Sequence, residues 1–297
     1  MNPPSRSASR ARLGRELRKY RTDAGLLIED AAKALDCSLS NVSRLETGKG
    51  IPRHRDVRDL LDLYKIFDEK TRQKVLELAA DGQGDEWWAD YRDVVRSDMF
   101  ADHLLRYVEL EQEALSLRWF ESEIFPGLFQ SETYIGAVAD WFFPAHTDEE
   151  RERFVAFRLR RQEILRTATG RTYEVVLSEA ALLRPVGNAH VMRVQAEWLH
   201  EALQKDLAHV EFRILPVTVP SAAAIGGPFI VMRFAEEHGD CVYFEGRENA
   251  EYLSGEDTLE EYDRKFELML TDTLDRSESV ERLARAAEDW HRAETGP

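Results

Sequence analysis

With 297 residues, 43% of them hydrophobic, the chain is long enough for about two domains with buried cores. Its two cysteines exclude a disulfide framework and a cysteine-only zinc site, and no signal peptide or membrane-spanning stretch is recognisable, so we expect a cytoplasmic protein. The formal net charge of −16 is uneven, because residues 1–60 hold 13 Lys and Arg against 8 Asp and Glu, which favours a basic module that binds a polyanion.

The first third of the chain predicts an all-α bundle of five short helices over residues 10–82, after a disordered basic arm at residues 1–9. Leu13, Leu17 and Tyr20 follow the spacing of one helical face, and Gly25 ends that helix. Similar stripes and end signals mark the others. The helices are expected at residues 13–24, 28–35, 39–47, 52–64 and 69–82.

The second and third helices flank a turn of about three residues, which is the geometry of a helix-turn-helix. An ordinary helical bundle can use the same short turn, so the outward face of the third helix is the informative feature. That face lies away from Val42 and Leu45 and contains no carboxylate. Its residues are Leu39, Ser40, Ser43 and Arg44. A solvated helix in so acidic a protein would be expected to carry acidic residues, so this face predicts contact with DNA.

From about Asp85 the composition changes and predicts a larger α+β domain over residues 85–297, ending in helices. Four stretches read as strands: YEVVLSEAALL from Tyr173, HVEFRILPVTV from His209, PFIVMRF from Pro228 and CVYFEG from Cys241. PFIVMRF is apolar on both faces, as a central buried strand would be. Helices are expected at residues 148–168, 188–204 and 256–294, the last as one long helix.

The final helix carries a stripe of apolar side chains that repeats every seven residues. It consists of Val280, Leu283, Ala287 and Trp290. Such a stripe can form a dimer interface or pack on its own domain. Both interpretations stay open from the sequence.

No catalytic motif is present: the eight histidines are scattered, and neither a metal-binding HExxH nor a phosphate-binding loop occurs. We therefore expect no enzyme, no metal and no cofactor. A pocket for a small molecule is an alternative use of the acidic domain. Aromatic residues could line it and arginines could hold an anion, or these residues could be core and ion-pair partners of Glu149, Glu150 and Glu152. They are Trp87, Trp88, Trp119, Phe120, Phe125, Phe129, Arg158, Arg160 and Arg161.

Motifs in two regions resemble known families. LRKYRTDAGL, EDAAKAL and SNVSRLETGK, within residues 10–66, resemble the Xre/Cro/C1-type helix-turn-helix family. DEWWADYRDVV, FESEIFPGLFQSETYIGAV and GGPFIVMRF resemble the DUF5753 effector domain of actinobacterial, Scr1-family antitoxin-like regulators. The resemblance implies a transcription regulator of the nucleoid whose activity a small DUF397-type partner protein controls. The alternative is a one-component regulator whose C-terminal domain binds a small-molecule ligand.

The helix-turn-helix resemblance also implies roles for single residues. Base contacts fall to Leu39, Ser40 and Arg44, and phosphate contacts to Ser38, Ser43, Lys49 and Arg53. Arg21 and Glu46 match an ion pair that joins the first helix to the end of the third. A head of this size implies a homodimer on a pseudo-palindromic double-stranded operator. Two positions depart from the family: Leu27 replaces a capping Thr or Ser, and Asp36 replaces a glycine.

Overall fold

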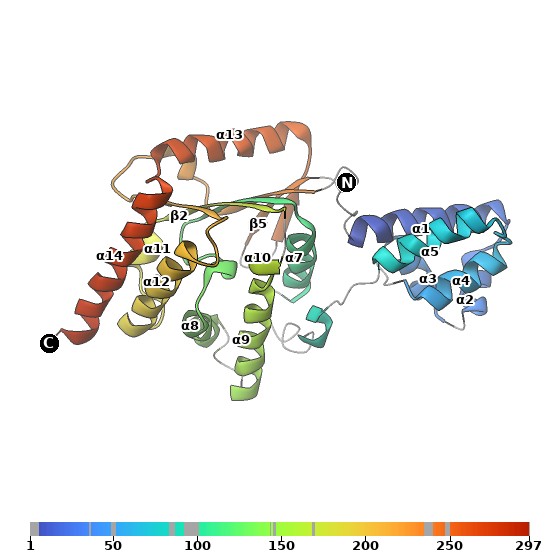
Figure 1. Cartoon of the computed structure of the whole chain (residues 1–297), viewed down its shortest axis with the longest axis horizontal. Helices are drawn as coiled ribbons and strands as arrows, with labels where there is room; N and C mark the ends of the chain where they lie inside the picture. Colours follow the sequence, from blue (N-terminus) through green and yellow to red (C-terminus); the bar gives the residue numbers. More distant parts are fainter. Residues whose placement is uncertain are drawn as a thin grey trace. The chain divides into compact units, whose positions relative to one another are not determined.

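The chain divides into an N-terminal helical unit that ends at Glu86 and a larger unit that begins at Trp87 (Figure 1). The computed structural model describes residues 6–35, 37–48, 52–82, 87–91, 101–142, 144, 147–167, 170–234, 240–246 and 250–296.

The N-terminal unit is the five-helix bundle that the sequence predicts. Its helices are α1 (Arg6–Asp23), α2 (Ile28–Ala34), α3 (Leu39–Glu46), α4 (His54–Leu63) and α5 (Glu69–Gly82). The apolar stripe of α1, which includes Leu13 and Leu17, packs in one buried cluster with residues of the other four helices. Gly25 follows α1 in the left-handed conformation, with φ of 70°, which a glycine adopts without the strain that a Cβ would impose.

The start of α1 differs from the disordered arm expected over residues 1–9. The helix begins at Arg6, and Ser9 and Arg10 are buried. Arg10 Nε donates a hydrogen bond of 2.8 Å to the carbonyl oxygen of Gly82 at the end of α5. Because this partner lies far along the chain, local sequence gives no sign that it orders the first turn. Residues 1–5 lie outside the described part of the chain.

The second unit contains a mixed six-stranded sheet in the order β3-β2-β1-β4-β5-β6. The first three strands in sequence are parallel to one another, and β4, β5 and β6 each run antiparallel to the strands they pair with. The strands are β1 (Ser116–Glu121), β2 (Thr172–Ser178), β3 (Glu211–Leu215), β4 (Phe229–Arg233), β5 (Cys241–Glu245) and β6 (Ala250–Leu253). The stretch PFIVMRF forms β4, a buried central strand as predicted.

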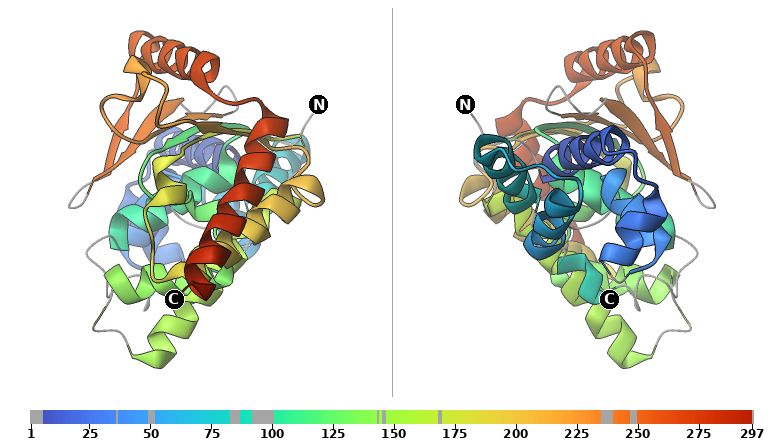
Figure 2. Two further views of the ribbon diagram at one scale, coloured as in Figure 1. Left: turned by 90° about the vertical axis from the view of Figure 1, so that its left-hand side faces the viewer. Right: turned by 90° about the vertical axis from the view of Figure 1, so that its right-hand side faces the viewer.

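Helices cover both faces of this sheet (Figure 2). In chain order they are η1 (Trp87–Tyr91), α7 (Ala101–Glu113), η2 (Gly127–Phe129), α8 (Glu132–Phe142), α9 (Asp148–Gln162), α10 (Ile164–Thr167), α11 (Ala180–Leu183), α12 (Ala189–Gln204), η3 (Ala222–Ala224), α13 (Glu256–Asp272) and α14 (Arg276–Thr295). The helix α13 packs on one face, where Phe120 and Val176 lie beneath Phe266. The larger core, which includes Leu117 of β1, lies on the opposite face against α8, α12 and α14.

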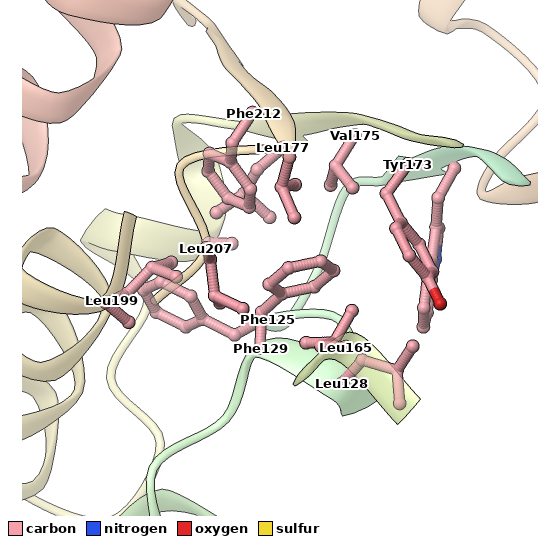
Figure 3. Packing of buried hydrophobic residues seen from close by; sticks show 14 of the residues in the cluster. Phe125, Leu128, Phe129, Leu165, Tyr173, Val175, Leu177, Leu199, Leu207 and Phe212 are labelled. Carbon is pink, nitrogen blue, oxygen red and sulfur yellow. The ribbon is translucent and has the colours of Figure 1, made fainter. Parts of the chain in front are cut away.

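The aromatic residues that the sequence offered as pocket lining are mostly core. Trp119, Phe125 and Phe129 are buried in the larger cluster, in which Figure 3 labels the two phenylalanines. Phe120 is buried under α13. Phe125 and Phe129 come from the turn that follows β1 and point toward side chains of the sheet such as Phe212. These side chains hold the segment around η2 against the sheet.

The chain after β2 turns earlier than expected. The predicted strand through Leu183 ends at Ser178, and residues 180–183 form the short helix α11 instead. Glu179 explains the turn, because its carboxylate accepts hydrogen bonds from Val217 N at 3.0 Å and from Arg282 Nε at 2.6 Å. Both partners are distant in sequence.

The terminal helix predicted over residues 256–294 is two helices. Asp275 ends the connection and caps α14, since its side chain accepts a hydrogen bond of 2.8 Å from Glu278 N. The apolar stripe of α14 packs on α12 and β3, with Leu283 fully buried, and Trp290 Nε1 donates to Leu182 O at 2.8 Å. The stripe is therefore core of its own domain and is not available as a dimer interface.

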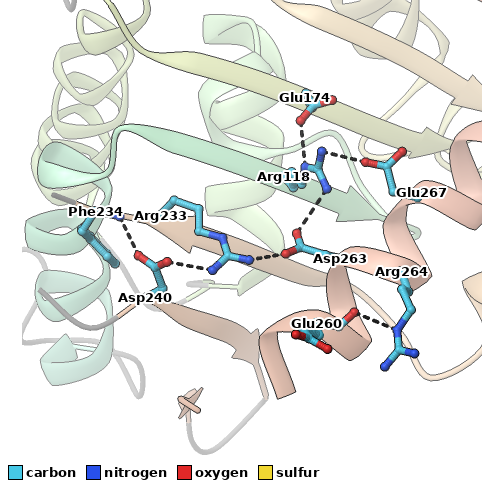
Figure 4. A network of polar contacts seen from close by, with 9 residues as sticks. All are labelled: Arg118, Glu174, Arg233, Phe234, Asp240, Glu260, Asp263, Arg264 and Glu267. Carbon is cyan, nitrogen blue, oxygen red and sulfur yellow. Dashed lines mark hydrogen bonds and ion pairs between the residues drawn. The ribbon is translucent and has the colours of Figure 1, made fainter. Parts of the chain in front are cut away.

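A network of ion pairs between side chains fixes α13 on the sheet (Figure 4). Arg118 of β1 pairs with Glu174 of β2 at 2.8 Å and with Glu267 of α13 at 2.7 Å. Asp263 of α13 accepts from Arg118 and from Arg233 of β4. Arginines on a strand are thus neutralised by carboxylates from other elements, which is why the sequence pattern did not predict β1.

Candidate nucleic-acid interface

The helices α2 and α3 form the helix-turn-helix. Ala31 and Ala32 of α2 are buried against the same cluster as Val42 of α3, and their small side chains allow the two helices to approach closely. Ser38 precedes α3 and caps it, because its hydroxyl accepts a hydrogen bond of 3.3 Å from Asn41 N. The recognition helix therefore begins at a defined residue and rests on a fixed neighbour.

The helix α1 crosses the end of α3 at very short range. A Cβ built on Gly14 would lie 2.5 Å from the carbonyl oxygen of Glu46, and one built on Gly48 would lie 2.8 Å from Ala11 Cα. Gly48 also has a φ of 72°, in the left-handed region. Only glycine fits at these two positions, so the backbone of α1 directly supports α3.

The outward face of α3 is exposed to solvent. Its exposed side chains are Leu39, Asn41, Ser43 and Arg44. Leu39 is 47% exposed, which is unusual for a large apolar residue and suits contact with a thymine methyl group. Ser40 lies on α3 one turn before Arg44, and its side chain lies outside the described part of the structure. Glu46, the only acidic residue of α3, is buried, so the described outward face carries no carboxylate.

Residues assigned to phosphate contacts flank this face. Ser38 and Ser43 are exposed, and Arg53 is exposed at the N-cap position of α4. Lys49 lies outside the described residues. Sequence reasoning left out Asn41, whose exposed amide can both donate and accept hydrogen bonds; its place on the exposed face of α3 is the signal that would have indicated it.

Arg21 and Glu46 form a bidentate ion pair. Arg21 Nε lies 2.6 Å from Glu46 Oε1, and Nη2 lies 2.9 Å from Oε2. The third nitrogen, Nη1, donates to Leu26 O at 2.9 Å. Only 11% of the Arg21 side chain and 5% of the Glu46 side chain are exposed, and the hydrogen bonds to Glu46 raise the pKa of Arg21. The pair joins α1, the turn after it and the last residue of α3.

Comparison with known families agrees with this geometry. Residues 104–285, more than half of the chain, match the family model described as a domain of unknown function, DUF5753. The chain belongs to the DUF5753 family. Residues 12–74 match the model of a helix-turn-helix domain, which supports a DNA-binding regulator. No curated protein and no solved structure matches the chain. The predicted combination of a helix-turn-helix with a DUF5753 domain is thus confirmed.

In the DUF5753 domain, the arginines of α9 have different surroundings. Arg161 is buried and pairs with the buried Glu111 of α7, with 2.6 Å between Nε and Oε2 and 2.7 Å between Nη2 and Oε1. Its guanidinium carbon also lies 4.9 Å from the centre of the Tyr107 ring. Arg160, by contrast, is exposed and stacks over Trp87 at 5.8 Å. Arg161 therefore joins α9 to α7 inside the domain. Its partner Glu111 was not predicted from the sequence.

The described residues include neither a membrane-spanning helix nor a cluster of metal-binding side chains. No helix among them is both apolar enough and long enough to cross a membrane. Within the same part of the chain, no three His, Cys, Asp or Glu side chains lie close enough together to bind a metal ion.

Proposed function

We propose that this DUF5753 protein is a sequence-specific, nucleoid-associated transcription regulator of the cytoplasm that inserts α3 into the major groove of DNA. The observation that carries this proposal is the exposed, carboxylate-free face of α3 in a chain of net charge −16. Arg44 is the main reader, because an arginine pairs with both acceptors of a guanine and discriminates against other bases by about 1–3 kcal/mol. Leu39 and Ser40 add weaker base contacts.

Phosphate contacts would fix the register of α3 on the duplex without reading its sequence. We assign them to Ser38, Ser43, Lys49 and Arg53. The hydroxyl oxygen of Ser38 already accepts the capping hydrogen bond of α3, so its own hydrogen remains available for a phosphate oxygen. The exposed guanidinium of Arg53 lies where the backbone N–H groups of α4 begin, a favourable position for an anion.

We further propose that the protein binds a pseudo-palindromic operator as a homodimer, because one head contacts too few base pairs for useful specificity. The dimer would use a surface other than the stripe of α14, because Val280, Leu283 and Ala287 are buried within their own domain and the partly buried Trp290 packs against the same core. A small DUF397-type partner, suggested by the resemblance, would control the regulator by binding one arrangement of the two heads more tightly. Its effect on DNA affinity equals its differential affinity for the two arrangements.

Selection of binding sites from a random DNA library with the full-length chain tests the proposal. Arg44→Lys is the matched control for Arg44→Ala, because lysine keeps the charge but cannot form the bidentate pair. We expect both variants to lose about 5- to 100-fold in affinity for the selected site, whereas Arg44→Lys keeps wild-type affinity for random DNA. Equal affinity of the wild type and both variants for the selected site would contradict the role of Arg44.

A second candidate is a one-component regulator whose DUF5753 domain binds a small molecule. The specific observation in its favour is a cleft beside α9 and α12, which has both an apolar floor and a cationic rim.

A further inference from the structure

The DUF5753 domain has a cleft of about 410 Å³, which is within the size range of small-molecule sites. It lies between the helix α9, the short helix α10 and the helix α12. Leu128, Leu165 and Leu207 form its floor, and all three belong to the buried core (Figure 3). Because this floor is part of the packed core, the cleft is pre-formed and does not require a rearrangement of the sheet.

Two aromatic side chains contribute walls. Trp198 of α12 and Tyr91 at the end of η1 line the cleft, and both are only partly buried. A half-exposed indole ring and a half-exposed phenol ring beside leucines offer flat apolar surface to a ligand. The body of a fitting ligand is therefore an aromatic ring or a chain of methylene groups.

The rim of the cleft is more cationic than anionic. Arg160 and Arg166 line it and are exposed, against one carboxylate, Glu163. The pairing of Arg166 with Asp206 is loose, at 3.5 Å between exposed side chains, so it contributes little energy that a ligand would have to replace. Two guanidinium groups above an apolar floor suit a carboxylate or sulfonate at one end of the ligand.

We propose that this cleft is a ligand-binding site of the DUF5753 domain for a small organic anion with an aromatic or long aliphatic body. This proposal specifies the class of ligand for the second candidate function, and it rests on that function for its role in regulation. The cleft also borders η1, the first described segment after the helix-turn-helix unit. Arg160 stacks over Trp87 of η1, and Tyr91 packs 5.7 Å from the ring of Phe157 on α9. A ligand that engages Arg160 and Tyr91 thus contacts the segment that leads to the DNA-binding unit.

Fluorescence titration of the full-length chain with two dyes tests the site. The anionic probe is 8-anilinonaphthalene-1-sulfonate, and its uncharged counterpart is N-phenyl-1-naphthylamine. We expect saturable binding of both dyes to the wild type. Ala156→Glu places a carboxylate on an exposed position of the rim, four residues before Arg160, and should weaken the sulfonate at least tenfold. Ala293→Glu, at an exposed position of α14, is the matched control and should bind like the wild type.

The double variant Arg160→Gln/Arg166→Gln tests the ligand class. It should weaken the sulfonate about tenfold and the uncharged dye less than twofold, because only the sulfonate uses the two positive charges. The control is Arg264→Gln/Arg285→Gln, which removes two exposed arginines of α13 and α14 and should leave both dyes unaffected. An equal loss of both dyes, or no loss of either, would overturn the assignment to an anion.

A loss of dye binding could also come from unfolding of a variant, so the stability of each variant is measured as well. All six tryptophans lie at position 87 or later, so tryptophan fluorescence during urea unfolding reports on the DUF5753 domain of each variant. An unchanged midpoint shows that a lost dye reflects the cleft. Absence of saturable sulfonate binding to the wild type, or wild-type binding by Ala156→Glu, overturns the site. Neither result bears on DNA binding, since no DNA is present in the titration.

Discussion

Arg21 satisfies all three of its guanidinium nitrogens inside the helical unit, two of them with Glu46 and one with Leu26 O. An arginine that is almost fully withdrawn from water is stable only with such partners, because desolvation of the charge is costly. The last residue of α3 is thereby tied to α1.

Removal of one partner should leave the other charge buried and unpaired. We therefore expect Glu46→Ala to destabilise the helical unit by about 2–4 kcal/mol and to weaken DNA binding through loss of order in α3. The unit has no tryptophan, so its stability is measured from the far-UV circular-dichroism transition in urea that tryptophan fluorescence does not follow. Glu77→Ala, at an exposed site of α5, is the control. Unchanged stability and DNA binding in Glu46→Ala would show that the pair has no bracing role.

Glu121 ends β1 in a partly buried position, and burial raises its pKa to about 7 even though the N–H groups of Ser122 and Glu123 donate to it. A carboxyl group whose folded pKa is raised favours folding when it is protonated. Its contribution is therefore complete below the ordinary pKa near 4.5 and is lost as the pH rises through about 7.

Replacement of Glu121 by an uncharged amide should remove this pH dependence. We expect Glu121→Gln to be about 1–2 kcal/mol more stable than the wild type at pH 8 and nearly equal to it at pH 4.5. Urea unfolding followed by tryptophan fluorescence at the two pH values measures the difference. Glu288→Gln, at an exposed site of α14, is the control and should behave like the wild type at both. If the difference in stability between Glu121→Gln and the wild type were the same at pH 4.5 and at pH 8, the raised pKa would be contradicted.

Single residues were predictable where their role depends on local spacing. The exposure of Leu39 and Arg44 and the capping by Ser38 follow from the helical periodicity of one short segment. Glu111 was not predictable as the partner of Arg161, because the two residues are 50 positions apart on different helices. Buried pairs of this kind depend on the tertiary fold, and the local patterns of a single sequence do not predict which distant positions will be in contact.

At the scale of elements, the approach of α1 to α3 is set by glycine. The three atoms nearest to a Cβ on Gly14 would all be backbone atoms, at 2.5–2.7 Å, and backbone atoms cannot move aside without shifting a helix. Gly136, in the middle of α8, differs in one respect: its nearest neighbour would be Arg151 Nη2 at 2.8 Å, the end of a flexible side chain.

The two glycines should therefore respond in opposite ways to the same substitution. Alanine is the better helix former by about 1 kcal/mol, so Gly136→Ala should be neutral or slightly stabilising. Gly14→Ala should cost about 1–3 kcal/mol because overpacking outweighs that gain. Tryptophan fluorescence measures the second unit, and the circular-dichroism transition that this fluorescence does not follow measures the first. Equal effects of the two substitutions would show that the crossing of α1 and α3 adapts easily.

Elements with strong local signals were predicted and those that depend on distant contacts were not. All five N-terminal helices and the strand β4 follow from periodicity, caps and glycine stops. The strand β1 was missed because Arg118 interrupts its apolar pattern, and its neutralising partner Asp263 is 145 residues away. The break before α14 was missed because Asp275 lies in a run of polar residues that would also suit a continuous helix.

At the scale of the whole molecule, charge is divided between the two units. Residues 1–82 carry 17 Lys and Arg against 13 Asp and Glu, whereas the complete chain has a net charge of −16. The acidic domain therefore adds a repulsive field against DNA that does not depend on base sequence. Such a field weakens specific and non-specific complexes alike, but only the specific complex has short-range base contacts that offset the repulsion.

Deletion of the acidic domain should reveal this effect in the salt dependence of binding. We expect a chain of residues 1–82 to bind random-sequence DNA about tenfold more tightly than the full-length protein at roughly 50 mM salt, with a steeper decrease as salt rises. The difference should fade above about 200 mM, where the screening length drops below about 8 Å. Fluorescence anisotropy with labelled random DNA measures how the affinity of each chain depends on salt, and circular dichroism checks that the fragment is helical.

Arg44→Lys serves as a control in both chains, because it preserves charge and should leave the slope of affinity against salt unchanged in each. Identical slopes for the fragment and the full-length chain would mean that the acidic domain does not influence access to DNA through its field.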